Sequence, residues 1–344
     1  MKLLIVLAMF SFAFIQTNAQ TNQPDLYLTK SLASEDIQSV EASTSGGSIK
    51  VEGVPSNEAR LEIYIRSNNG KTLSKEEIES RLNANYDLKV EVASKKLSVI
   101  TKTKNRWSGK NALSISYRIF IPKNTTTNLQ TSGGSISLDN LSGNQDFQTS
   151  GGSLSVSNVS GRINGQTSGG SISLKNSSDE IRLVTSGGSI KAENCKGNIR
   201  LVTSGGSLKL NDLNGNISAS TSGGSVEANN ITGDLVAKTS GGSVRMNGLA
   251  CNLETATAGG SIDVAFLKPV KSIKVSNSAG NVRLQLPGNQ GLDLNLSGSK
   301  INTGNLKNFS GSVDKNSVDG KLNGGGNDVY VSAGSGAITL NLVD

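Results

Sequence analysis

The sequence has 344 residues, with 40 glycines, 4% aromatic residues, no histidine and a formal net charge of +7. So few aromatic side chains cannot build a thick core, so we expect a thin core that is continuous along a repeat. The absence of histidine excludes Ser-His and Cys-His catalytic pairs and histidine metal sites. The positive charges are mixed with acids and form no dense basic stripe, which argues against a nucleic-acid partner.

Residues 1–19 have the layout of a secretory signal peptide. Lys2 precedes a largely apolar run from Leu3 to Ile15, and small residues stand at Thr17 and Ala19. The apolar run is shorter than the roughly 20 residues that a membrane-spanning helix needs. We therefore expect cleavage after Ala19, no transmembrane segment, and export to the periplasm, the outer surface or the medium.

Residues 20–130 form an N-terminal strand and capping region. An isolated Thr-Ser-Gly-Gly tetrad begins at Thr44, and residues 61–66 alternate as a strand. The capping box SKEE at residues 74–77 predicts one short helix over about 74–86. Residues 88–103 and 113–122 read as two strands joined by a loop. We expect this block to cover the first coil of the repeat and hide its open strand edge.

From residue 131 to 268 the chain repeats with a step of 18 residues. Seven Thr-Ser-Gly-Gly tetrads and one Thr-Ala-Gly-Gly variant begin at Thr131, Thr149, Thr167, Thr185, Thr203, Thr221, Thr239 and Thr257. A fixed period over this distance is the signature of a solenoid. We predict an all-β, single-stranded parallel β-helix (β-solenoid) of regular coils, wound right-handed because parallel crossovers usually are.

Each coil has two apolar strand patterns when the tetrad threonine is counted as its first position. The sixth and eighth positions are apolar around polar neighbours, and the fifth is always serine, as in Ser171-Ile172-Ser173-Leu174. The fifteenth position supplies a second apolar column and leads into the tetrad threonine. We expect that threonine to face inward, unlike the outward threonine arrays of ice-binding solenoids.

Two corners connect the strands of a coil. The glycine pair of the tetrad permits backbone angles closed to other residues and predicts a sharp turn. An Asn/Asp-x-x-Gly pattern at the tenth to thirteenth positions, as at Asn140 and Asp212, predicts the other turn. Coils stacked in parallel would lie about 4.8 Å apart.

Residues 269–344 carry weaker copies of the repeat. These begin at Asn277, Asn295, Val313 and Val331, again 18 residues apart. We expect irregular solenoid coils here, followed by the C-terminal cap.

With these motifs in view, the chain resembles the bacterial putative-adhesin domain family of unknown function, a β-helical family. The resemblance covers most of residues 37–300 and rests on STSGGSIKVEG, the short helix, YRIFIPKNTTTNLQ and the TSGGSISLDNLSG coils. It implies a β-helical fold and defines no catalytic residue.

The two cysteines fall in different coils. Cys195 is at an eleventh position and Cys251 at a thirteenth, three coils apart, which is about 14 Å at the spacing of paired strands. A disulfide requires Cα atoms within roughly 7 Å. We therefore predict two free, buried or half-buried thiols.

The loop TKTKNRWSGKN is the one candidate binding feature. It holds the single tryptophan, Trp107, beside Lys104, Arg106 and Lys110. An exposed indole among cations could dock on a sugar or an anionic surface. The alternative is a hairpin tip whose aromatic side chain folds back onto its own strands.

The sequence predicts an exported, non-enzymatic β-solenoid that serves as an adhesin or as a structural or binding protein of the cell surface. The expected partners are glycans, cell-surface or matrix components, and we predict no catalytic, cofactor or metal site. Two alternatives stay open: a carbohydrate-active β-helix enzyme, and a periplasmic scaffold or sensor partner. The acids of the array do not stack in adjacent coils, which argues against the enzyme: Asp139, Glu193, Glu227 and Asp263.

Overall fold

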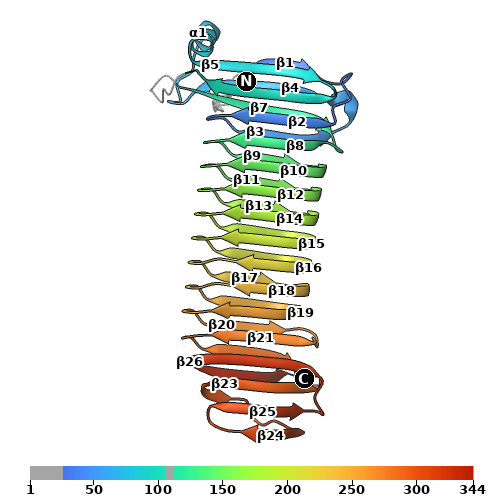
Figure 1. Ribbon diagram of the computed structural model, residues 1–344, viewed down its shortest axis with the longest axis vertical. Helices are drawn as coiled ribbons and strands as arrows, with labels where there is room; N and C mark the ends of the chain where they lie inside the picture. Colours follow the sequence, from blue (N-terminus) through green and yellow to red (C-terminus); the bar gives the residue numbers. More distant parts are fainter. Residues whose placement is uncertain (1–25, 105–111, 344) are drawn as a thin grey trace, which may run out of the picture.

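The repeat folds as a tall stack of paired strands in a computed structural model that describes residues 26–104 and 112–343 (Figure 1). Each coil contributes two strand segments, which are continuous in β15, β16 and β19, and the two stacks of segments face each other across a thin core. The regular coils form the stem, and differently paired strands close its two ends. Among the described residues, no helix is both long and apolar enough to span a membrane.

The elements fall into three groups in chain order. Before the stem come β1 (Leu26–Ser31), β2 (Ser39–Thr44), β3 (Ile49–Val54), the 3-10 helix η1 (Ser56–Glu58), β4 (Arg60–Ser67), α1 (Lys75–Asn85), β5 (Tyr86–Ala93), β6 (Lys96–Thr103) and β7 (Leu113–Pro122). The stem contains β8 (Thr126–Thr131), β9 (Ile136–Asp139), β10 (Ser142–Thr149), β11 (Leu154–Ser157), β12 (Ser160–Thr167), β13 (Ile172–Lys175), β14 (Ser178–Thr185), β15 (Ile190–Thr203), β16 (Leu208–Ser220), β17 (Val226–Asn229), β18 (Thr232–Lys238), β19 (Val244–Thr257), β20 (Ile262–Phe266), β21 (Ser272–Asn277) and β22 (Val282–Pro287). The distal end is made of β23 (Leu292–Asn302), β24 (Phe309–Val313), β25 (Ser317–Leu322) and β26 (Asn327–Val343).

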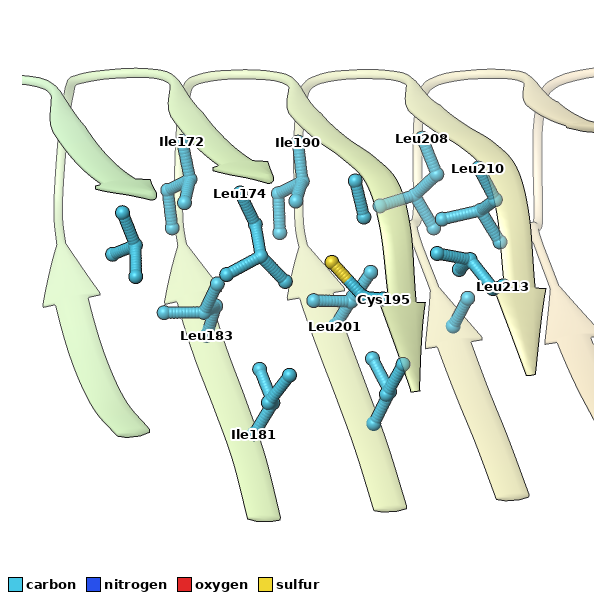
Figure 2. Close-up of a cluster of buried hydrophobic side chains, with 14 of the residues drawn as sticks. Ile172, Leu174, Ile181, Leu183, Ile190, Cys195, Leu201, Leu208, Leu210 and Leu213 are labelled. Atoms are coloured by element: carbon cyan, nitrogen blue, oxygen red, sulfur yellow. The ribbon is translucent and has the colours of Figure 1, made fainter. Parts of the chain in front are cut away.

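The apolar columns of the repeat form the core of the stem. Ile172 pairs with Ile190 in the next parallel strand, and Ile190 pairs with Leu208 in the one after. Figure 2 shows these three side chains in successive layers, with Leu183 and Leu201 in layers of the same core. All five are at most 2% exposed. The predicted all-β solenoid is therefore confirmed, because equivalent residues of successive coils lie one above the next.

The tetrad threonines face inward and tie one coil to the next. The Thr167 hydroxyl donates to the Gly152 carbonyl of the preceding coil (2.7 Å) and accepts the Gly170 backbone N–H of its own coil (3.3 Å). The same two bonds recur at each tetrad from Thr131 to Thr257. Each threonine therefore satisfies two backbone groups that would otherwise be buried without partners.

The glycine pair has a different role from the one predicted. Neither Gly169 nor Gly170 adopts the left-handed φ that favours glycine. A Cβ on Gly170 would lie 2.1 Å from the Gly152 carbonyl oxygen, whereas one on Gly169 would lie 3.6 Å from its nearest atom. The fourth position therefore requires glycine because stacked backbones touch there, and the expectation of unusual turn angles is wrong.

The Asn/Asp-x-x-Gly corner does use left-handed backbone. Its first residue has φ between 48° and 56°, as at Asn158 and Asp212, and its glycine has φ between 100° and 125°, as at Gly161. One coil places Asp179 at the glycine position with φ of 86°. The Asp179 carboxylate accepts the Gly161 N–H from the preceding coil (2.9 Å), so this exception is held by a side-chain bond.

At the N-terminal end, the isolated tetrad that begins at Thr44 forms part of the stack. β2 and β3 pair in parallel with β8 and β9, so Thr44 lies opposite Thr131 and Ile49 opposite Ile136. The intervening chain returns as β6 and β7, which pair in parallel with the other edges of β2 and β3. Beyond these, β4 and β5 pair antiparallel with β7 and β6, and β1 pairs with β4.

One strand prediction in this end is wrong. Residues 88–103 form two strands, β5 and β6, which pair as a hairpin instead of one continuous strand. Ser94 and Lys95 both have positive φ (49° and 61°), as a tight two-residue hairpin turn requires. The predicted helix lies where it was expected: α1 begins after Ser74, whose side chain accepts the Glu77 N–H.

The distal end also departs from the predicted order of coils. β21 pairs not with the next segment but with the first half of the last strand, β26, which places Asn277 opposite Ala333. β26 in turn pairs with β23, and the antiparallel strands β25 and β24 close the stack beyond it (Figure 1).

The weak copies at Asn295 and Val313 therefore do not continue the stem. Asn277 stands at a corner, and its amide donates to the Gly260 carbonyl (2.8 Å), as a tetrad threonine would. Asn295 lies instead within β23 and is exposed. The physical reason is that these two weak copies keep some residue types of the repeat but lack the buried hydrogen bonds at the corners that define a coil.

Candidate functional site

The predicted binding loop falls mostly outside the described residues. Arg106, Trp107 and Lys110 belong to residues 105–111, so the structure does not test the proposed indole site. Lys104 is described, and its ammonium donates to the Asn83 carbonyl (2.6 Å) near the C-terminal end of α1. A cation at that end of a helix interacts favourably with the helix dipole, so Lys104 has a local structural partner.

The stem carries a longitudinal groove of about 590 Å³ on the sheet that contains β11, β13, β15, β16 and β17. Its lining repeats from coil to coil. The fifth and seventh positions provide Ser153, Ser155, Ser171, Ser173, Ser189, Lys191, Ser207, Lys209, Ser225 and Glu227. The stem therefore presents a uniform strip of exposed hydroxyl groups, with charged side chains along one half.

The serine hydroxyls of this strip are partly used by the fold. The Ser207 N–H donates to the Ser189 hydroxyl oxygen (3.1 Å), and the Ser225 N–H donates to the Ser207 hydroxyl oxygen (3.2 Å). Each of these backbone groups lies at a corner outside the sheet ladder. A serine that accepts such a bond still has its own proton to donate outward. These serine hydroxyls thus stabilise the corner and leave hydroxyl donors on the surface.

The scattered acids of the array are paired with neighbouring side chains. Glu193 lies between Lys191 (2.5 Å) and Lys175 (3.1 Å), whose hydrogen bonds and charges lower its pKa. Asp263 pairs with Arg283 (3.2 Å). Glu227 is 3.7 Å from Lys209, and the Asp139 carboxylate accepts from the Asn158 amide (2.9 Å). The lowered pKa favours the ionised form of Glu193, and each of the other three carboxylates already has a side-chain partner, which suits surface pairing.

Both cysteines are free and buried, as predicted. Burial raises the pKa of Cys195 and raises the pKa of Cys251 to about 12. The thiolate is the reactive form of cysteine, so a raised pKa makes both thiols poor nucleophiles. They belong to the core of the stem.

The outer face of β4 and β7 carries a cluster of aromatic and charged side chains. The Arg60 guanidinium lies 3.7 Å from the Phe120 ring centroid, and that of Arg118 lies 4.7 Å from the Tyr64 ring centroid. Glu62 accepts from Arg60 (2.7 Å) and Tyr64 (2.8 Å). Partial burial works to raise the pKa of Glu62, but these two hydrogen bonds together with the charges of Arg60 and Arg118 lower it. The cluster satisfies its own charges and leaves little for a ligand.

A second groove, of about 440 Å³, lies at the distal end where β25, β23 and β26 run side by side. Its lining includes Tyr330, Asn295 and three aspartates, Asp293, Asp319 and Asp328. No sequence pattern predicted this site, because its residues come from three separated segments. The one local signal is the alternation of residues 327–331, which places Asp328 and Tyr330 on the outward face of β26.

Comparison with known proteins adds two structural neighbours. No family model matches the chain, and no curated protein matches it. A putative cell adhesion protein from Clostridium sporogenes is 13% identical, with 93% of this chain and 100% of that chain covered and a TM-score of 0.20. A putative adhesin from Bacteroides fragilis is 16% identical, with 70% and 97% covered and a TM-score of 0.38. Likenesses this distant support no argument about fold or function, which therefore rest on the chain itself.

Proposed function

We propose that this protein is an exported, non-enzymatic β-solenoid that acts as an adhesive or structural rod at the cell surface. The observation that carries the proposal is the uniform stem. The same buried bonds from threonine to glycine recur from Thr131 to Thr257, so successive coils repeat one cross-section. A stack of this kind is stiff along its axis because every coil is bonded to both neighbours. Such a rod suits the task of holding an end away from a surface.

The outward chemistry of the stem supports the same proposal. Most of its acids are engaged by lysine, arginine or asparagine, and Glu193 and Glu254 have lowered pKa values because lysines donate to them. A glycosidase needs one carboxylic acid whose pKa is raised toward neutrality. These particular carboxylates therefore fit surface pairing better than hydrolysis.

The function is tested by locating the full chain and shortening its stem. Cells that express it should expose it to added protease and should adhere to immobilised glycans or matrix proteins better than cells without it. Deleting residues 185–220 joins Val184 to Thr221 and removes two whole coils, so every column stays in register. The stem should shorten by roughly 10 Å. We expect the purified variant to keep its fold and its binding, while adherence of cells decreases.

A matched deletion of residues 185–211 removes one and a half coils and serves as the control. It should fail to fold, because the inward and outward columns no longer align. Protein that is confined to the periplasm, with adherence unchanged, would favour the scaffold or sensor alternative. Release of sugars from a polysaccharide by the purified chain would favour the enzyme.

A further inference from the structure

The distal groove differs in kind from the rest of the surface. Its lining comes from three neighbouring strands: β23 pairs with β26 on one side and with the antiparallel strand β25 on the other (Figure 1). Its volume of about 440 Å³ is within the range of small-ligand sites, roughly 300–1,000 Å³. It also lies near the end of the rod, where a contact with another surface would occur. We propose that this groove binds a carbohydrate, and that the sugar is uncharged or carries an amino group.

Tyr330 supplies an aromatic wall. Its side chain is 44% exposed, whereas Tyr86 and Tyr117 are buried at 7% and 1%. Within the described residues, no hydrogen bond or ion pair engages the Tyr330 hydroxyl. An exposed phenol ring that the fold does not use offers an apolar face with a polar tip. The C–H face of a sugar ring matches such a surface, since one side of the sugar is apolar and its rim carries hydroxyls.

Hydrogen-bonding groups surround that ring. Asn295 lies directly between Asp319 and Tyr330 in the register of the three strands, and its amide donates to the Asp319 carboxylate (2.8 Å). This bond fixes the amide so that its carbonyl oxygen is left to accept. The Asp328 carboxylate has no partner in the parts of the chain that the structure describes. The groove therefore offers fixed acceptors to a ligand with several O–H or N–H donors.

The charge of the groove decides between classes of sugar. Three carboxylates and the ammonium of Lys321 line it, which gives a net charge of −2 (−3 + 1) on a protein of net charge +7. Lys321 is 4.0 Å from Asp293, whose other oxygen accepts the Gly326 N–H (3.2 Å). Asp293 and Asp328 are direct neighbours across the two strands.

Like charges placed opposite each other in a sheet are destabilising, and the stem pairs its acids with lysine or arginine instead. A ligand that donates hydrogen bonds or carries a positive charge would relieve this repulsion, whereas an acidic sugar would add to it. A metal ion is a poorer fit, since no group of three or more acidic, cysteine or histidine side chains within the described residues is placed to hold one.

This inference rests on the proposed binding role and gives it a site and a ligand class. Calorimetry on the full chain without its leader would measure binding of cello-oligosaccharides (neutral), chitosan oligosaccharides (amino-bearing) and oligogalacturonates (acidic). We expect measurable binding of a neutral or amino-bearing oligosaccharide and none of the acidic one. Tyr330→Ala should weaken that binding by about tenfold or more, and Tyr330→Phe by no more than about threefold. Asp328→Asn should remove any preference for the amino-bearing sugar.

Val313→Ala provides the matched control, because Val313 is exposed at the same end of the rod but does not line the groove. It should bind as the parent chain does. The inference is overturned if no neutral or amino-bearing sugar binds, or if Tyr330→Ala binds as well as the parent. If cells that carry Tyr330→Ala still adhere, the proposed function stands, but this groove is not the site responsible for it. If the purified chain binds sugar but the protein never reaches the cell surface, the site stands and the proposed function is contradicted.

Discussion

The stem and the two ends of the rod form their strand ladders in different ways. From β8 to β19, the strands of successive coils pair with residues 18 positions away, so one sequence pattern repeated in register builds this part of the stack. At the ends, the partners are 87 residues apart at Thr44 and Thr131, and 56 apart at Asn277 and Ala333. Both ends then finish with antiparallel strands. The comparison teaches that a repeat can propagate a solenoid but cannot terminate it.

The largest effect is expected where stacked coils touch. Gly206→Ala places a Cβ 2.1 Å from the Gly188 carbonyl oxygen, so the two coils must separate locally. We expect a loss of about 3 kcal/mol or more of unfolding free energy, measured by urea or thermal denaturation. Gly205→Ala is the control, because its Cβ comes no closer than 3.4 Å to another atom. Equal stability of the two variants would contradict the stacking contact.

The N-terminal end should be weakened selectively at alkaline pH. Burial raises the pKa of Tyr117 to about 12, and its hydroxyl donates to the Ser43 carbonyl (3.1 Å). An unfolded tyrosine ionises near pH 10, so the contribution of Tyr117 is complete below about pH 10 and is lost as the pH rises toward 12. The loss should reach about 2–3 kcal/mol at the upper limit.

Tyr117→Phe tests this pH dependence directly. The variant should be less stable than the parent at neutral pH, and the difference should shrink as the pH rises through that window. Thermal unfolding at a series of pH values, with phenolate absorbance recorded alongside, gives both quantities. A difference that stays constant with pH would show that folding does not shift the pKa of Tyr117.

A smaller effect is expected from one buried hydroxyl of the stem. Thr203→Val keeps the shape of the side chain but leaves the Gly188 carbonyl and the Gly206 N–H without the partners they have at 2.7 and 3.3 Å. We expect a loss of about 1–2 kcal/mol in chemical denaturation. Ser204→Ala, at the exposed neighbouring position, should change stability by less than about 0.5 kcal/mol. If Thr203→Val left the unfolding free energy unchanged, water would have to reach these two backbone groups.

The fold of the stem was predictable because its information is local and periodic. The column of Ile172, Ile190 and Leu208 is visible in the sequence as an apolar position that recurs every 18 residues, and these three residues do pair in order. The role of the tetrad glycines was not predictable from one coil, since the contact that requires them lies between coils. The right-handed winding stays a prediction.

The strand pairing at the two ends and the distal groove could not be predicted from the sequence in the same way. The turn at Ser94 and Lys95 contains no glycine or asparagine that would have indicated its positive φ values. The distal groove unites Asn295, Asp319 and Tyr330, which are separated in sequence and share a face only because β26 pairs with β23. No local pattern encodes that pairing. The loop around Trp107 stays a prediction, because its indole lies outside the described residues.

The position of β26 also governs the order in which the molecule can be completed. A chain that emerges from the ribosome N-terminus first can add β8 to β22 one after another, each onto a neighbour already made. β23 cannot do so, because β26, the strand that separates it from β21 and β22, comes later in the chain. Closure of the distal end therefore waits for β26, and a chain that lacks residues 327–343 would be left with unpaired edges on both sides of the gap.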